Sequence, residues 1–135
     1  MPEKILVVDD EPVQRRLLEA TLGKLGYDPL CVESGQEALD ILTGKNGNRI
    51  KAVILDLVMP EMDGMAVLEA MRSQKLAHPV IVQTAQGGVE TAVNAMRAGA
   101  MDFVVKPAAP QRLKTSVQNA MRMEALQGEI KRIKR

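Results

Sequence analysis

The sequence predicts an α/β domain built around a five-stranded parallel sheet. Five short apolar runs rich in Val and Ile alternate with longer segments of helical periodicity, which is typical of successive strand–helix units. Most of these runs lack polar alternation, as strands buried on both faces do. A length of 135 residues with 46% hydrophobic residues suits a single domain of ordinary size.

The five apolar runs are the predicted strands. Four of them lack polar alternation, while the second mixes polar and apolar residues and therefore suits an outer position in the sheet. In chain order the runs are Lys4–Val8, Asp28–Val32, Ala52–Leu55, Pro79–Val82 and Phe103–Val105.

The first two predicted helices have clear boundary signals. Pro12 suits the first turn of a helix that ends at Gly26. Ser34 and Glu37 have the spacing of a capping box, in which polar side chains three residues apart bond the first turn. The apolar residues at helical spacing are Val13, Leu17, Leu18 and Leu22, and then Ala38, Leu39, Ile41 and Leu42.

The third helix should begin near Asp63 and end before Pro79, and the fourth should run from about Gly88 to Ala98, where Gly99 stops it. Their predicted buried faces are Met65 or Ala66, Val67, Leu68 and Met71, and then Val89, Ala92, Val93 and Met96.

The last predicted helix starts at Pro110 and is unusually long. About 25 residues at 1.5 Å each span roughly 38 Å, more than one face of a domain, so its end should project. We therefore predict a domain over residues 1–122 and a helical linker or dimerisation segment over 123–135, with an unpartnered chain end as the alternative. The apolar stripe is Leu113, Val117, Ala120, Met121, Leu126, Ile130 and Ile133.

Composition narrows the class of protein. The single Cys31 excludes an intramolecular disulfide, no signal-peptide pattern is visible, and no apolar run approaches the roughly 20 residues of a membrane span. We therefore expect a cytoplasmic protein without membrane contact. The net charge of +1 combines +5 from Arg112 onward with −4 before it, and we interpret the basic tail as a charged linker rather than a nucleic-acid surface.

Polar residues follow every predicted core strand. Asp9 and Asp10 follow the first and Asp56 the third, while Thr84 and Lys106 follow the fourth and fifth. In an open α/β sheet ligands bind beyond the carboxyl ends of the strands where strand order reverses, so the order 2-1-3-4-5 places the three aspartates in one crevice. Clustered carboxylates persist when a cation offsets their repulsion or when one group keeps its proton. If a cation binds, a ligand set made only of oxygen favours Mg²⁺, or Mn²⁺ in its place.

This combination suits phosphoryl transfer. A carboxylate beside Mg²⁺ and an ammonium can attack phosphorus to form an acyl phosphate, with Lys106 neutralising the phosphoryl oxygens and the Thr84 hydroxyl donating to one of them. Gln83 is polar in an otherwise apolar strand, and nothing in the sequence assigns it a function.

Four segments together resemble the receiver domain of bacterial two-component response regulators over residues 3–122. The resemblance implies a flavodoxin-like, doubly wound fold and a regulatory domain rather than an enzyme. The segments are Ile5–Pro12, Val53–Pro60 with Gly64, Val80–Ala85 and Gly99–Pro107.

The resemblance also implies roles for individual residues. Asp56 would accept a phosphoryl group from a sensor histidine kinase, with Lys106 contacting that group and the Lys106–Pro107 peptide in the cis form. Thr84 and Phe103 would form a switch pair. The implied Mg²⁺ ligands are Asp10, Asp56 and the backbone carbonyl of Val58, with Asp9 acting through water.

Three functional alternatives follow from these patterns. Residues 87–103 look like receivers joined to sigma-54-dependent activators, so control of an output domain in transcription activation is the first expectation. A freestanding single-domain regulator is the second. A phosphatase of the haloacid dehalogenase kind would need a second Asp two residues after the nucleophile, where this chain has Val58.

Overall fold

The structure, a computed structural model, describes residues 2–59, 62–85 and 88–133, and side chains up to residue 127. Five parallel strands form one sheet in the order β2-β1-β3-β4-β5, which confirms the predicted flavodoxin-like fold and the outer place of the second strand. The strands are β1 Lys4–Val8, β2 Asp28–Val32, β3 Ile50–Asp56, β4 Val80–Thr84 and β5 Asp102–Val105.

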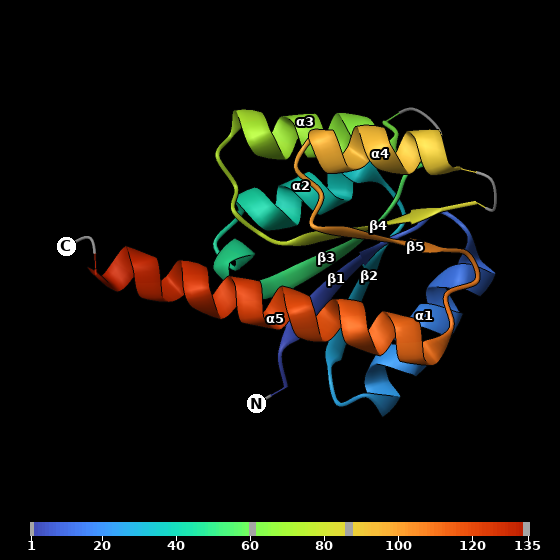
Figure 1. The fold of residues 1–135 in the computed structure, drawn as a ribbon, viewed down its shortest axis with the longest axis horizontal. Coiled ribbons are helices and arrows are strands. Elements are labelled where there is room, and N and C mark those ends of the chain that lie inside the picture. Colours follow the sequence, from blue (N-terminus) through green and yellow to red (C-terminus); the bar gives the residue numbers. More distant parts are fainter. Residues whose placement is uncertain (1, 60–61, 86–87, 134–135) are drawn as a thin grey trace.

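Helices cover both faces of the sheet. Helices α2, α3 and α4 lie on one side and α1 and α5 on the other (Figure 1), and each face has its own hydrophobic cluster. The helices are α1 Pro12–Lys24, α2 Gly35–Thr43, α3 Gly64–Ser73, α4 Val89–Arg97 and α5 Pro110–Ile133, with a short 3-10 helix over Gly47–Arg49.

Strands β3 and β4 end later than their apolar runs predict. Asp56 is the last residue of β3 and Thr84 the last of β4, and Asp56 pairs in register with Gln83 of the neighbouring strand. Sequence hydrophobicity missed these polar ends, because their burial depends on partners from other strands. The extension matters because it holds both residues in the sheet rather than in a loop.

The predicted helix starts of α2 and α3 are confirmed by their caps. The Ser34 hydroxyl accepts the backbone N–H of Glu37 at 3.2 Å, and the Asp63 carboxylate accepts that of Ala66 at 2.9 Å. Each cap satisfies a backbone donor that has no partner within the helix.

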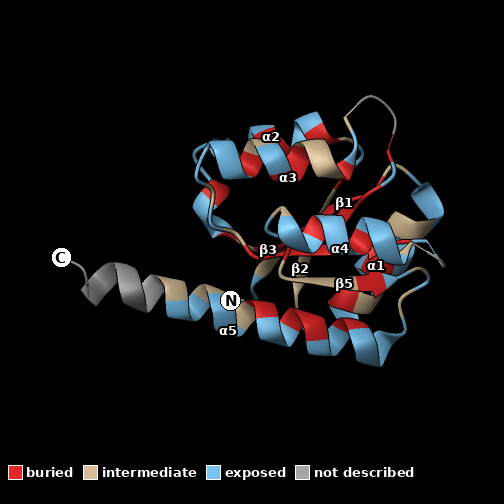
Figure 2. Cartoon of the chain, turned by 45° about the horizontal axis from the view of Figure 1, so that its top comes forward, coloured by how far each residue is buried: buried red, intermediate tan, exposed pale blue. Residues whose placement is uncertain are grey.

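The predicted buried faces of α1 and α4 are partly wrong. In α1, Leu18 and Leu22 are buried, but Val13 is 72% exposed and Leu17 48%. In α4 the buried residues are two alanines, and the larger apolar residues are exposed. Most of this helix accordingly has the pale blue of exposed residues in Figure 2. Small residues let α4 approach the sheet closely, which leaves its flanks outside the contact. The buried residues are Ala92 and Ala95, and the exposed ones are Val89, Val93 and Met96.

Helix α5 has 24 residues, and its C-terminal part extends past the sheet (Figures 1 and 2). Its first half is buried through Leu113, Val117 and Ala120, whereas Leu126 further along is 56% exposed. The side chains of Ile130 and Ile133, which the sequence places in the same stripe, lie outside the described residues. The role of residues 123–135 as linker or dimerisation segment stays a prediction. Within the described part of the chain, every helix is too short or too polar to traverse a bilayer.

A carboxylate joins β5 to the start of α5. Asp102 accepts two hydrogen bonds from the Arg112 guanidinium, at 3.1 and 3.0 Å, and one from the N–H of Phe103 at 2.8 Å, and it also contacts the Ser116 hydroxyl. Burial raises the pKa of Asp102, but the hydrogen bonds from Arg112, Ser116 and Phe103 outweigh it, so the pKa lies below its ordinary value.

We expect Asp102→Asn to lower the free energy of unfolding at neutral pH by about 1–2 kcal/mol, because charge-assisted hydrogen bonds are lost. Since the folded-state pKa is below the unfolded value of about 3.9, the stabilisation is present above that value and disappears as the pH falls through the folded pKa. Urea unfolding at neutral and strongly acidic pH measures both effects.

The matched control is Asp28→Asn, which breaks a more exposed ion pair with Lys4 (3.2 Å) on the edge strand. Its effect should stay within about 0.5 kcal/mol. Equal losses in the two variants at neutral pH would contradict the assignment.

Candidate functional site

The carboxyl ends of the central strands bring the predicted polar residues together. Asp56 ends β3, and Asp9 directly follows β1, whose Val8 pairs with Leu55. Because strand side chains alternate and neighbouring strands are in register, Asp9 and Asp56 project to the side covered by α1 and α5. Lys106 directly follows β5, and its ammonium contacts both aspartates.

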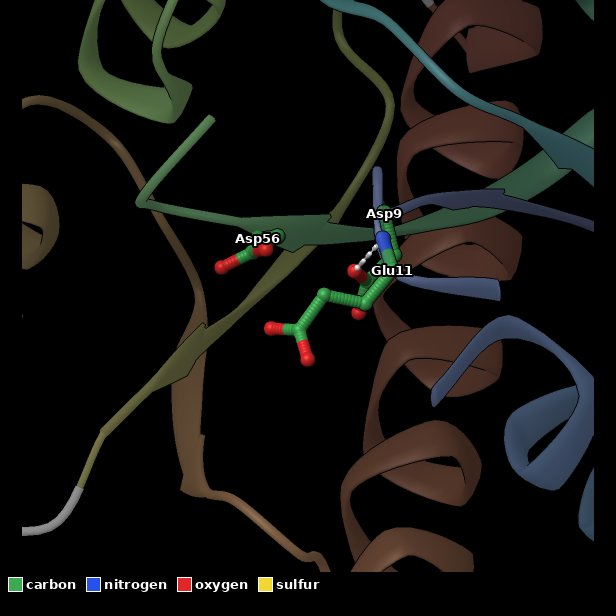
Figure 3. Close-up of side chains that lie close together, drawn as sticks. All are labelled: Asp9, Glu11 and Asp56. Atoms are coloured by element: carbon green, nitrogen blue, oxygen red, sulfur yellow. Dashed lines mark hydrogen bonds between the residues drawn. The ribbon is translucent and has the colours of Figure 1, made fainter. Parts of the chain in front are cut away.

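Three carboxylates converge at this edge (Figure 3). One oxygen from each of Asp9, Glu11 and Asp56 lies within 4.8 Å of the others, and the Asp9 side chain also accepts the Glu11 N–H at 2.9 Å. Asp9 and Asp56 are buried, whereas Glu11 is exposed at the rim. Asp10 is half-buried and outside this group, so its coordination of a metal stays a prediction.

Glu11 is the residue that sequence reasoning missed as a participant. Its position directly after the two aspartates was a visible signal, but the resemblance assigned it no role. The structure brings its carboxylate to 3.4 Å from Lys106 Nζ, at the entrance of the site.

Lys106 is the cation of the site. Its Nζ lies 3.0 Å from Asp56 Oδ2, 3.5 Å from Asp9 Oδ2 and 3.4 Å from Glu11 Oε1, and its side chain is largely buried. Burial lowers the pKa of Lys106, but the adjacent Asp56 carboxylate and the negative charges of Asp9 and Glu11 outweigh this effect and raise the pKa. The ammonium therefore stays protonated. The Lys106–Pro107 peptide is cis, as the resemblance implied.

The negative charge of the Asp56 carboxylate is only partly compensated by the groups around it. The side chain is buried, and Oδ1 accepts the Val58 N–H at 3.1 Å. Burial raises the pKa of the Asp56 carboxyl, the Lys106 and Val58 donors oppose the rise, and Asp9 adds to it. Although Lys106 Nζ is only 3.0 Å from Oδ2, it is not aligned for a hydrogen bond, and this buried oxygen has no hydrogen-bond partner.

These residues fit a divalent cation. Three carboxylates face one ammonium, and a buried carboxylate oxygen without a hydrogen-bond partner is costly unless a cation or donor reaches it. Carboxylate and carbonyl oxygens are the ligands that Mg²⁺ prefers, and it keeps several waters when it binds only one or two of them. Asp56 and Asp9 are placed to hold such an ion, with the Val58 backbone next to them.

Thr84 and Phe103 lie together on the opposite side of the sheet edge. Phe103 pairs in register with Val82, and Thr84 lies two residues beyond Val82 on the same face. Phe103 packs against the cluster beneath α2, α3 and α4, and Thr84 is buried at the end of its strand. The two side chains are therefore neighbours next to α4, while their action as a switch stays a prediction.

Gly64 lets α3 start against the backbone that carries Asp56. A Cβ at this position would lie 2.5 Å from the Asp56 carbonyl oxygen and 2.7 Å from the Leu57 Cα, and the Gly64 N–H donates to the Leu57 carbonyl at 3.2 Å. Backbone atoms cannot yield as flexible side chains do, so only glycine fits without moving the loop that follows Asp56.

Comparison with known proteins identifies the class. The sequence matches the family model of the response regulator receiver domain over residues 5–118, and the chain belongs to this family.

Individual relatives agree with this assignment. The chain is 38% identical over 130 residues to the regulatory protein AtoC of Escherichia coli, a match that covers 96% of the chain but 28% of AtoC. It is 39% identical over 121 residues to a chemotaxis protein CheY homologue of Campylobacter jejuni, covering 87% of this chain and 92% of that protein. The chain thus spans a minor part of one relative and nearly all of another.

A solved structure gives the same result. The crystal structure of a response regulator receiver domain protein from Clostridium thermocellum superposes with a TM-score of 0.84 at 34% identity, covering 91% of this chain and 97% of that one.

We expect Gly64→Ala to lower the free energy of unfolding by about 1–3 kcal/mol, because the added Cβ overlaps backbone atoms. Gly23→Ala is the matched control, since a Cβ there meets nothing within 4 Å in the last turn of α1, and the variant should keep or slightly raise the wild-type stability. Urea unfolding compares the two. Equal stability of the two alanine variants would show that position 64 does not pack tightly against the backbone of Asp56 and Leu57.

Proposed function

We propose that this receiver domain is a phosphoryl-accepting switch in which Asp56 is phosphorylated by a sensor histidine kinase in the presence of Mg²⁺ or Mn²⁺. The single observation that supports this most is the buried Asp56 carboxylate, whose Oδ2 has no hydrogen-bond partner beside an ammonium at 3.0 Å. A buried carboxylate beside an ammonium and a cation can act as a nucleophile and form a covalent bond to phosphorus.

Each neighbouring group has a task in this proposal. The cation, held by Asp10, Asp56 and the Val58 carbonyl with Asp9 acting through water, would offset charge on the phosphoryl oxygens. Lys106 would contact the same oxygens as a point charge. The chemistry of the chain is limited to transfer of the phosphoryl group to itself and its later loss as phosphate.

The signal would leave through α4, β5 and α5. A phosphoryl group adds about −1.5 to −2 charges, and it can shift a conformational equilibrium only by binding one state better than another. The Thr84 hydroxyl would move toward the phosphoryl oxygens, and the Phe103 ring would turn into the space it leaves. Their shared place next to α4 supports this order of events.

Control of an output domain is the favoured readout. The match to AtoC, of which this chain covers 28%, and the length of α5 both support a domain connected to a partner that activates transcription. The alternative is a freestanding regulator, favoured by the CheY homologue, of which the chain covers 92%. Neither version requires direct contact with nucleic acid or membrane, and we expect the cytoplasm as its location.

Incubation with acetyl phosphate and Mg²⁺ should add the mass of one phosphoryl group to the wild-type chain and none to Asp56→Asn. Lys106→Met should slow the labelling by about 10²-fold, because a charge next to the transferred group is lost. Intact mass spectrometry over time measures both. Asp28→Asn, on the edge strand, serves as the control with wild-type labelling, and label on Asp56→Asn would refute the assignment of the acceptor.

The last helices should form a homodimer whose affinity changes with phosphorylation. Beryllofluoride with Mg²⁺, a mimic of the phosphoryl group, should change the dimer dissociation constant by about tenfold, a usual size for coupling between sites. Leu126→Glu should weaken the dimer without affecting the monomer, because Leu126 is 56% exposed on α5. Sedimentation equilibrium gives the constants. Equal affinity with and without beryllofluoride would exclude this route of output.

A further inference from the structure

Gln83 is a buried polar residue that the family roles above leave unexplained. It lies near the carboxyl end of β4, an inner strand of the sheet, is 0% exposed, and is the register partner of Asp56 on β3. Its side chain projects to the same side as that of Ile81, two residues earlier, which belongs to the cluster covered by α1 and α5. This is the side on which Asp9 and Asp56 also lie.

The Gln83 amide contacts a residue of the acidic group. Its Nε2 donates to Asp9 Oδ2 at 3.3 Å, across the intervening strand β3. The other Asp9 oxygen, Oδ1, accepts the N–H of Glu11 at 2.9 Å. The two donors hold the Asp9 carboxylate from both oxygens, so its orientation is set by the protein before any ligand arrives.

The same oxygen of Asp9 also faces Lys106, at 3.5 Å from Nζ. The Gln83 amide and the Lys106 ammonium both contact Asp9 Oδ2, so the ammonium is not needed to compensate the Asp9 charge alone. The ammonium lies closer to Asp56 Oδ2, at 3.0 Å. Without the amide, this Asp9 oxygen would keep, among the described residues, only its ion pair with Lys106, and Asp9 would compete with Asp56 for the ammonium.

Gln83 is also poorly suited to a purely structural role. Its Oε1 is buried and has no hydrogen-bond partner among the described residues. A buried amide with one of its polar atoms unpaired is less favourable than an apolar side chain of similar size. A residue that costs stability while contacting a functional carboxylate is typical of a site requirement rather than of core packing.

We propose that Gln83 is a positioning residue that orients the Asp9 carboxylate for the divalent cation. Its hydrogen bond to Asp9 also keeps the Lys106 ammonium available to pair with Asp56. This inference rests on the proposed function, since it concerns the same cation site. It assigns to β4 a second contribution to the site, besides the Thr84 hydroxyl.

The test compares Gln83→Met with Ile81→Val in the full chain. Methionine keeps the length and approximate volume of glutamine and removes both polar atoms, whereas Ile81→Val removes one buried methylene on the same strand and face. Isothermal titration with Mg²⁺ alone gives cation affinity without any phosphoryl donor. Urea unfolding in a chelator gives stability without the cation.

For Gln83→Met we expect about a tenfold weaker Mg²⁺ affinity, the usual effect of losing a residue that orients a metal ligand, together with unchanged or higher stability. For Ile81→Val we expect the reverse pattern, with stability lower by about 0.5–1.5 kcal/mol and Mg²⁺ affinity unchanged. The NMR signal of the Glu11 amide, which donates to Asp9, should shift in Gln83→Met and stay in place in Ile81→Val.

Two results overturn the inference. If Gln83→Met binds Mg²⁺ as tightly as the wild type, or if it loses stability as well as affinity, Gln83 is a packing residue. If the wild type binds Mg²⁺ and takes up a phosphoryl group, such a result leaves the proposed function intact. A wild-type chain that binds no Mg²⁺ would remove both proposals together.

Discussion

The burial of the Asp56 carboxylate beside Lys106 is the constraint on which the rest of the site depends. Taking a carboxylate out of water is unfavourable, and one ammonium does not fully compensate three acidic groups. The site therefore keeps a demand for positive charge that its own residues leave unmet. In the proposed function, this unmet demand is the reason why the site would accept first a cation and then a phosphoryl group.

The parallel sheet brings these residues together through its backbone geometry alone. Adjacent strands that point the same way end at one edge, so residues 47 positions apart, such as Asp9 and Asp56, become neighbours through backbone register alone. The close packing of Gly64 against the Asp56 carbonyl then brings the start of α3 next to the end of β3. The positions of the site residues are thus set mainly by the backbone, and their side chains supply the charge.

Strand positions, helix starts and the acidic edge were predictable, because they depend on local periodicity, capping residues and the rule that parallel strands end together. Strand order does not follow from these patterns and comes from the doubly wound fold type. What the sequence could not show were contacts made across strands or between layers. Glu11 joining the acidic group and Gln83 reaching Asp9 both depend on tertiary geometry. The exposure of Val89 on α4 was likewise hidden, since helical spacing alone does not show which face meets the sheet.

Helix α4 is attached to the sheet mainly by Ala92 and Ala95, its two buried residues. A methyl side chain buries little apolar area, and each buried carbon contributes only about 0.8 kcal/mol of stabilisation. Sliding or tilting this helix therefore loses less packing energy than moving a helix that is anchored by leucines. A helix held mainly by two methyl groups therefore has little packing energy to lose when it shifts. In the proposed switch, the charge of a phosphoryl group on Asp56 would have only this small restraint to overcome.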